Sequence, residues 1–96
     1  MNTIWKYTLF VTDEQIIRIP ADTEPLTVMM QFGAGNIGVM NLWVRVKDTK
    51  APQYLQPIRI YGTGNPIPDD AEQDEVYIGS VLDREFVWHV YWVVVG

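Results

Sequence analysis

Apolar and polar residues alternate with a period of two along most of the chain, and the apolar ones are rich in β-branched and aromatic types. No window of a dozen residues carries an amphipathic helical stripe. The pattern predicts an all-β fold, a small antiparallel β-sandwich or β-roll of about seven strands, in a single domain over residues 1–96. The expected strands lie near Ile4–Val11, Gln15–Pro20, Leu26–Phe32, Val39–Lys47, Pro57–Tyr61, Val76–Leu82 and Phe86–Val95.

The alternation also predicts which side chains share a face, because successive residues of a strand point to opposite sides of the sheet. Inward positions are predicted for Leu42, Val44 and Val46 and for Ile58 and Ile60, which leaves Trp43, Arg45 and Lys47, and Arg59 and Tyr61, on the outer faces. Half-buried faces are predicted for Trp5, Tyr7, Leu9 and Val11 and for Leu26, Val28, Met30 and Phe32.

The last predicted strand has no formally charged residue on either face. One face holds Phe86, Trp88, Val90, Trp92 and Val94, and the other holds Val87, His89, Tyr91, Val93 and Val95. One small core cannot easily cover both faces, since open antiparallel sheets usually leave one side polar. We therefore expect a homo-oligomer with Val87, His89, Tyr91 and Val93 at or near the interface; the alternative is that loops of the same chain cover this face.

Composition narrows the possible partners. The chain has 96 residues, no cysteine and a net charge of −5. The absence of cysteine excludes a disulfide scaffold and cysteine-ligated metal sites and suits a reducing cytoplasm, where we expect the protein. The negative charge argues against binding a nucleic-acid polymer or an anionic membrane. No signal peptide or membrane-spanning stretch is recognisable, because the longest apolar run, "FVWHVYWVVVG", is too short to span a bilayer.

The stretch "RIYGTGNPIPDD", residues 59–70, places two glycines after a predicted strand, as in nucleotide-binding loops. A dinucleotide fingerprint would lead into a helix, and a phosphate-binding P-loop would need its lysine. Here Pro66 and Pro68 follow instead, and proline blocks a helix interior. The preferred interpretation is a glycine-permitted turn followed by a stiff, extended loop.

A binding interpretation remains open at this loop. Arg59 and Tyr61 point outward just before it, and Gly62, Thr63, Gly64 and Asn65 add amide and hydroxyl donors. Guanidinium, aromatic ring and amides together could hold a small, flat anion such as a nucleotide, with Arg59 contributing little to the core. Trp43 and Arg45 repeat the pairing on another strand and are the second candidate site.

Residues for catalysis are scarce. His89 is the one histidine and lies in the most apolar strand, and Ser80 is the one serine, so a hydrolytic triad is not expected. The acidic run "PDDAEQDE", residues 68–75, lacks the ligand order of an EF-hand and is read as a solvated loop. We therefore expect no enzyme activity, no metal and no cofactor.

Three stretches carry a family resemblance: "TIWKYTL", "IRIYGTGNPIPDD" and "YIGS…WHVYWVV". Together they resemble small, mostly uncharacterised phage and prophage proteins with a W-K-[YF] start, a central R-[IV]-Y-G-T-G-x-P-[IL] motif and a final H-V-[FY] strand. Residues 33–56 are not placed by the resemblance. It implies phage origin and expression in the bacterial cytoplasm, but no reaction.

Two functions follow as hypotheses. The first is a non-enzymatic counter-defence protein that sequesters a nucleotide-derived immune signal or binds a host defence protein. The second is a structural or assembly module of a phage particle that mediates protein–protein association. A bound small molecule would favour the first, and co-purification with particles the second.

Overall fold

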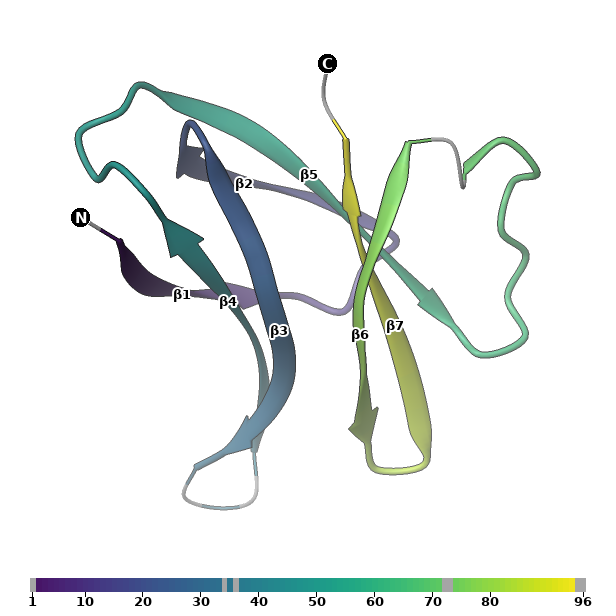
Figure 1. The fold of residues 1–96 in the computed structure, drawn as a ribbon. Coiled ribbons are helices and arrows are strands. Elements are labelled where there is room, and N and C mark those ends of the chain that lie inside the picture. The colour runs from purple at the N-terminus through teal and green to yellow at the C-terminus, as the bar shows by residue number, and fades with distance from the viewer. Residues whose placement is uncertain (1, 34, 36, 72–73, 95–96) are drawn as a thin grey trace.

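The structure is a computed structural model that describes residues 2–33, 35, 37–71 and 74–94. It contains seven strands, and every pairing between them is antiparallel (Figure 1). The strands are β1 (Thr3–Leu9), β2 (Glu14–Pro20), β3 (Thr23–Phe32), β4 (Gly38–Val46), β5 (Gln53–Gly62), β6 (Glu75–Asp83) and β7 (Phe86–Val93). The all-β prediction is confirmed, and no helix in the described ranges is long and apolar enough to cross a membrane.

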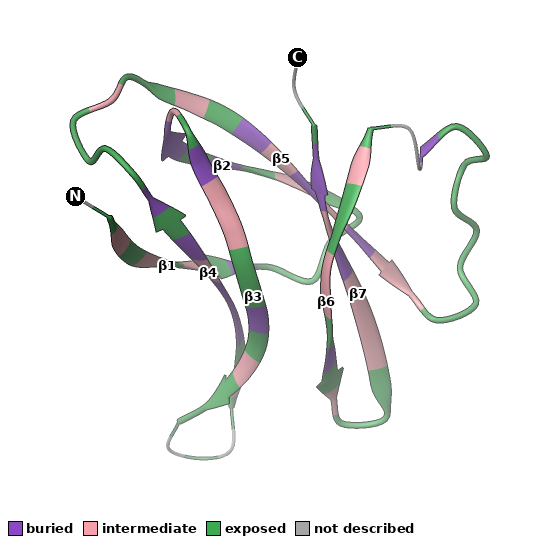
Figure 2. Ribbon diagram, viewed as in Figure 1, coloured by how far each residue is buried: buried purple, intermediate pink, exposed green. Residues whose placement is uncertain are grey.

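The strands form a three-stranded sheet in the order β1-β4-β3 and a four-stranded sheet in the order β2-β5-β7-β6. The Cα extents of 40 × 39 × 16 Å are those of a flat body two sheets thick. The inner faces of both sheets supply one core, and the buried parts of the strands meet there (Figure 2). Its most deeply buried apolar members are Ile19, Leu42, Val44, Val46, Ile58 and Val90.

Strands β3 and β6 run side by side where the two sheets approach each other (Figure 1). Each strand has an irregularity in its pairing, between Pro25 and Thr27 in β3 and between Tyr77 and Gly79 in β6. Glycine at position 79 permits the approach, since a Cβ there would lie 3.3 Å from Cγ1 of Val28. The two sheets are therefore closest to each other along this side.

The predicted strand positions are close to the observed ones, with two starts predicted too late. Strand β3 begins at Thr23 rather than Leu26, and β5 begins at Gln53 rather than Pro57. Strand β1 ends at Leu9, so Val11 lies in the following loop and is exposed. Strand β7 ends at Val93, with Val94 exposed beyond it, and Val95 lies outside the described residues.

The predicted faces hold for β4 and β5, whose inward residues are buried. They hold only in part for β3, where Val28 is buried but Leu26 and Phe32 are exposed. The irregularity between Pro25 and Thr27 shifts the alternation at Leu26, which the sequence pattern alone does not reveal. Phe86 is likewise exposed, because it stands at the end of β7 beside the turn from β6.

Candidate functional site

The outer face of the four-stranded sheet carries the residues that the sequence singled out around "RIYGTGN". Strand β5 lies between β2 and β7, so the side chains of Arg59 and Tyr61 stand in the middle of this face. In the register of the sheet, Arg59 lies opposite Tyr91 and Tyr61 lies opposite His89. We call the outward side chains of Arg59, Tyr61, Tyr77, Ser80, His89 and Tyr91 the tyrosine face.

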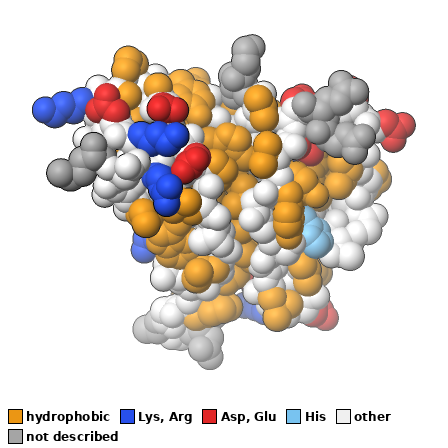
Figure 3. Space-filling view, in the orientation of Figure 1, with side chains coloured by type: hydrophobic (Ala, Val, Ile, Leu, Met, Phe, Trp, Pro, Cys, Tyr) orange, Lys and Arg blue, Asp and Glu red, His pale blue; other side chains and the backbone are white. Residues whose placement is uncertain are grey.

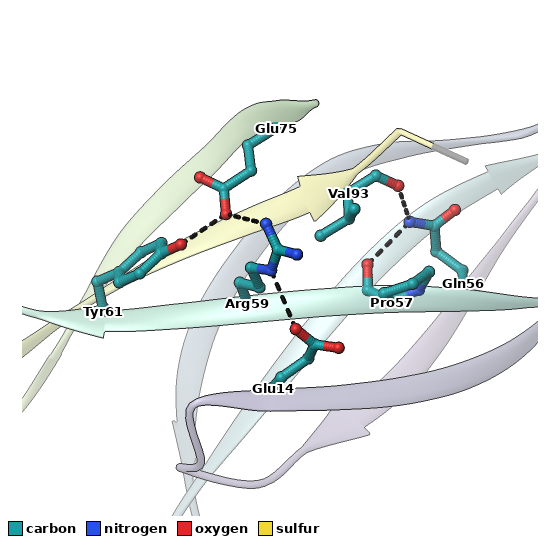
Figure 4. A network of polar contacts seen from close by, with 7 residues as sticks. All are labelled: Glu14, Gln56, Pro57, Arg59, Tyr61, Glu75 and Val93. Atoms are coloured by element: carbon teal, nitrogen blue, oxygen red, sulfur yellow. Dashed lines mark hydrogen bonds and ion pairs between the residues drawn. The ribbon is translucent and has the colours of Figure 1, made fainter. Parts of the chain in front are cut away.

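Arg59 is held between two carboxylates. Its Nε donates to Oε2 of Glu14 on β2, and its Nη1 donates to Oε2 of Glu75 on β6, both at 3.0 Å (Figure 4). The two acids differ in burial, since the Glu75 side chain is 2% exposed and the Glu14 side chain is 51% exposed. The hydrogen bonds to Glu14 and then to Glu75 raise the pKa of Arg59 above its ordinary value. The one guanidinium of the face is therefore already neutralised by acids of the same chain.

Tyr61 belongs to the same network, because its hydroxyl donates to Oε2 of Glu75 at 2.6 Å. Burial, followed by this hydrogen bond, raises the pKa of Tyr61 to about 12. The Tyr61 ring meets the Tyr91 ring edge-on with centroids 5.5 Å apart, and Tyr77 meets Tyr91 from the other side at 5.3 Å. Three tyrosine rings thus form a continuous layer across β5, β7 and β6.

His89 is bonded through both ring nitrogens. Its Nδ1 lies 2.7 Å from Oγ of Ser80, and its Nε2 lies 2.8 Å from Oγ1 of Thr63. Ser80 is further hydrogen-bonded to the Tyr77 hydroxyl. The contact between the one serine and the one histidine resembles part of a catalytic dyad, but the second ring nitrogen meets a hydroxyl where a triad has a carboxylate to stabilise the imidazolium. This arrangement fixes the orientation of the imidazole ring between the two hydroxyls.

The two glycines of the motif are explained by backbone geometry. The Asn65 amide donates to the Gly62 carbonyl at 3.0 Å, and Gly64 has φ +88°, which is the pattern of a type II turn. A Cβ on Gly62 would lie 3.0 Å from Nδ2 of Asn65 and 3.1 Å from Cζ3 of Trp88. The predicted turn is confirmed; Gly64 supplies its positive φ, and Gly62 gives room for the close packing of Asn65 and Trp88.

An acidic hollow of about 370 Å³ opens beside Arg59 and Tyr61. Four carboxylates line it, from Asp13, Glu14, Asp70 and Asp74, with Pro68 and Ala71 completing the wall. Arg59 is its one cation and is already paired. The hollow therefore favours a positively charged group over a nucleotide. Within the described ranges, no three histidine or acidic side chains are grouped closely enough to hold a metal ion.

The structure separates the predicted ligand residues into two groups. Arg59, Tyr61, Gly62, Thr63, Gly64 and Asn65 lie together at one end of β5. Trp43 and Arg45 lie on the outer face of the other sheet, where Arg45 forms an ion pair with Glu24 at 3.4 Å. The two candidate sites therefore cannot act on one ligand within a single copy.

The predicted interface residues lie on β7, which is a central strand of its sheet. Val93 is buried, and Val87, His89 and Tyr91 are half-buried. Neighbouring side chains of β5 and β6 cover part of this face. The sequence prediction treats the face as uncovered within one copy of the chain. Hydrophobic side chains remain widespread on the surface over β3 and β6, with the histidine at their margin (Figure 3).

Sequence reasoning missed Glu14, Glu75, Tyr77 and Ser80 as members of the site. The acidic run predicts a solvated Glu75, but this residue begins β6 and its side chain is buried in contact with Arg59. Asp69, Asp70 and Asp74 are exposed as expected, and Glu72 lies outside the described residues. The available signal was the alternation itself, which places Glu75 and Tyr77 on the same face of a predicted strand.

Comparison with known proteins gives one result. A family described as "Domain of unknown function (DUF7352)" matches residues 1–95. Searches of curated proteins and of solved structures found no match.

Proposed function

The chain belongs to the DUF7352 family, and we propose that it is a non-catalytic, phage-derived binding protein whose tyrosine face docks onto another protein. The observation that supports this most is the pairing of Arg59 with Glu14 and Glu75 on the same face as a layer of three tyrosine rings. Tyrosine and arginine are enriched at the energetic centres of protein interfaces, because they combine a large apolar area with a polar tip.

The charge of the face selects the chemistry of the partner. Glu14 and Glu75 outnumber Arg59, and the adjoining hollow adds Asp13, Asp70 and Asp74. A partner that presents a lysine or arginine beside an apolar patch complements this arrangement. A host defence protein or another phage protein with such a patch fits, and a nucleotide would meet repulsion from the acids.

The first test compares a tyrosine-face variant with a matched control. Tyr77 is exposed on the edge strand β6, so Tyr77→Ala removes a ring from the face with little effect on the core. The control is Thr27→Ala, at an exposed position on the outer face of the other sheet. Affinity purification from a bacterial lysate should recover a partner with wild type and the control. With Tyr77→Ala, retention of this partner should fall by about tenfold or more.

A calorimetric titration with linear and cyclic nucleotides separates the alternative. The proposal expects no binding. A nucleotide that binds wild type would replace protein docking with nucleotide sequestration. A partner retained equally by Tyr77→Ala and by wild type would place the binding surface elsewhere.

A further inference from the structure

Strand β2 is an edge of the four-stranded sheet, with β5 as its neighbour on one side. The Asp13 carbonyl accepts from the Ile60 amide at 3.1 Å, and the Ala21 amide donates to the Pro52 carbonyl at 2.8 Å. Odd-numbered residues therefore direct their backbone polar groups toward β5. Since these groups alternate along an antiparallel strand, the even-numbered residues of β2 direct theirs to the outer edge.

The other sheet edges are less suited to pairing. Strands β3 and β6 each carry an irregularity and lie against each other, and bulged edges resist the addition of a further strand. The side chains on the outer face of β1 are those of Ile4, Lys6 and Thr8. They include one positive charge and no acid to pair with it. Strand β2 has no irregularity in its pairing, and its even-numbered side chains are Glu14, Ile16 and Arg18, which are one acid, one apolar residue and one base, followed by the buried Pro20.

We propose that two copies of the protein pair antiparallel along β2, with Ile16 on the twofold axis. In that register Glu14 of each copy lies opposite Arg18 of the other, and Ile16, which is 57% exposed, lies against its own symmetry mate. The outward amides of Glu14, Ile16 and Arg18 all find partners. Pro20 has no amide to donate, and its place falls beyond the paired segment.

The pairing also completes the charge network of the tyrosine face. Oε2 of Glu14 accepts from Arg59, and Arg18 of the second copy would reach the remaining oxygen of the same carboxylate. The cluster would then hold two acids, Glu14 and Glu75, and two bases. This dimer follows from the edge of β2 and does not depend on what the tyrosine face binds.

The geometry of the dimer has a consequence for binding. A twofold axis perpendicular to the sheet joins the two four-stranded sheets into one of eight strands, with both tyrosine faces on the same side. The two β7 strands are then separated by five strand spacings, or about 24 Å. Such a dimer presents two docking surfaces in one direction and can bind a repetitive or dimeric partner with increased avidity.

Cysteine cross-linking tests the register directly, because the chain has no native cysteine. In Ile16→Cys the two Cα atoms would face each other as a hydrogen-bonded pair about 5.5 Å apart, within the range of a disulfide. The control is Ile4→Cys on β1, where the native side chain is 59% exposed against 57% for Ile16. Mild oxidation should give a covalent dimer from Ile16→Cys and little from Ile4→Cys. Equal cross-linking of both variants, or none from Ile16→Cys, would overturn the proposal.

A charge reversal provides the second test. Arg18→Glu places two acids opposite each other across the axis and should weaken the dimer by at least about tenfold in light scattering, whereas Arg18→Lys should retain it. Thermal melting checks that Arg18→Glu still folds. Tyr77→Ala should leave the dimer intact, so failure of the dimer and failure of the docking function are distinguishable. A wild-type monomer at micromolar concentration, or a dimer insensitive to Arg18→Glu, contradicts the proposed pairing.

Discussion

Substituting Arg59 by alanine should destabilise the fold, because it leaves the buried Glu75 carboxylate without its cation. Losing one partner of a fully buried pair costs about 3–5 kcal/mol. Here the Arg59 side chain is 28% exposed, so water can enter the vacated space and reduce the cost of losing the ion pair with Glu75. Loss of the exposed ion pair with Glu14 adds about 0.2–1 kcal/mol. We expect a total loss of about 2–4 kcal/mol in the free energy of unfolding.

The assay is urea unfolding at neutral pH, followed by the fluorescence of the four tryptophans. Glu14→Gln serves as the control and should cost no more than about 1 kcal/mol, since that carboxylate is half exposed. Adding Glu75→Gln to Arg59→Ala should recover part of the loss, because the uncompensated charge is removed. If Arg59→Ala unfolds within about 0.5 kcal/mol of wild type, the guanidinium does not support the sheet and the reasoning fails.

Three further predictions follow from the same region. Gly64→Ala should cost about 1 kcal/mol or more, because Gly64 has φ +88°, while Gly33→Ala, where an added Cβ meets nothing within 4 Å, should be nearly neutral in the same urea assay. Gln56→Leu should cost about 1–3 kcal/mol by leaving the Val93 carbonyl without its donor, and an unchanged midpoint would argue against that role. Folded Tyr61 keeps its proton up to a pKa of about 12, against an ordinary value of 10.0, so its stabilisation is present below pH 10 and is lost as pH rises through 12. Tyr61→Phe should reduce this alkaline loss in urea titrations between pH 10 and 12, and an identical pH profile would contradict it.

The alternation of side chains was sufficient to predict the seven strands and the inward residues of β4 and β5, because the core of a two-sheet fold depends on that period. It failed at the start of β5. Pro57 argues against a central strand, since proline cannot donate to a neighbouring strand. The side-chain amide of Gln56 donates to the carbonyls of Val93 at 2.6 Å and of Pro57 at 2.8 Å instead (Figure 4). Such a local substitute for a backbone donor cannot be read from sequence periodicity.

The candidate site was predictable in position but not in chemistry. The outward placement of Arg59 and Tyr61 follows from strand alternation, and the turn at Gly64 follows from glycine and proline. The acids that neutralise Arg59 are Glu14 and Glu75, which lie 45 and 16 residues away in the sequence. Their meeting depends on the strand order β2-β5-β7-β6, which the sequence pattern leaves undetermined. For that reason the sequence pattern shows Arg59 as an outward cation but not its pairing with two acids of the same chain.

Photocrosslinking from the tyrosine face tests the proposed docking function most directly. A benzoyl-phenylalanine at position 77 replaces an exposed ring of the face, and the same group at position 43 reports on the outer face of the opposite sheet. In bacteria that express the protein, we expect a defined cross-link to another protein from position 77 that is absent from position 43. Cross-links of equal yield from both positions, or a cross-link from position 43 alone, would contradict the assignment of the tyrosine face as the docking surface.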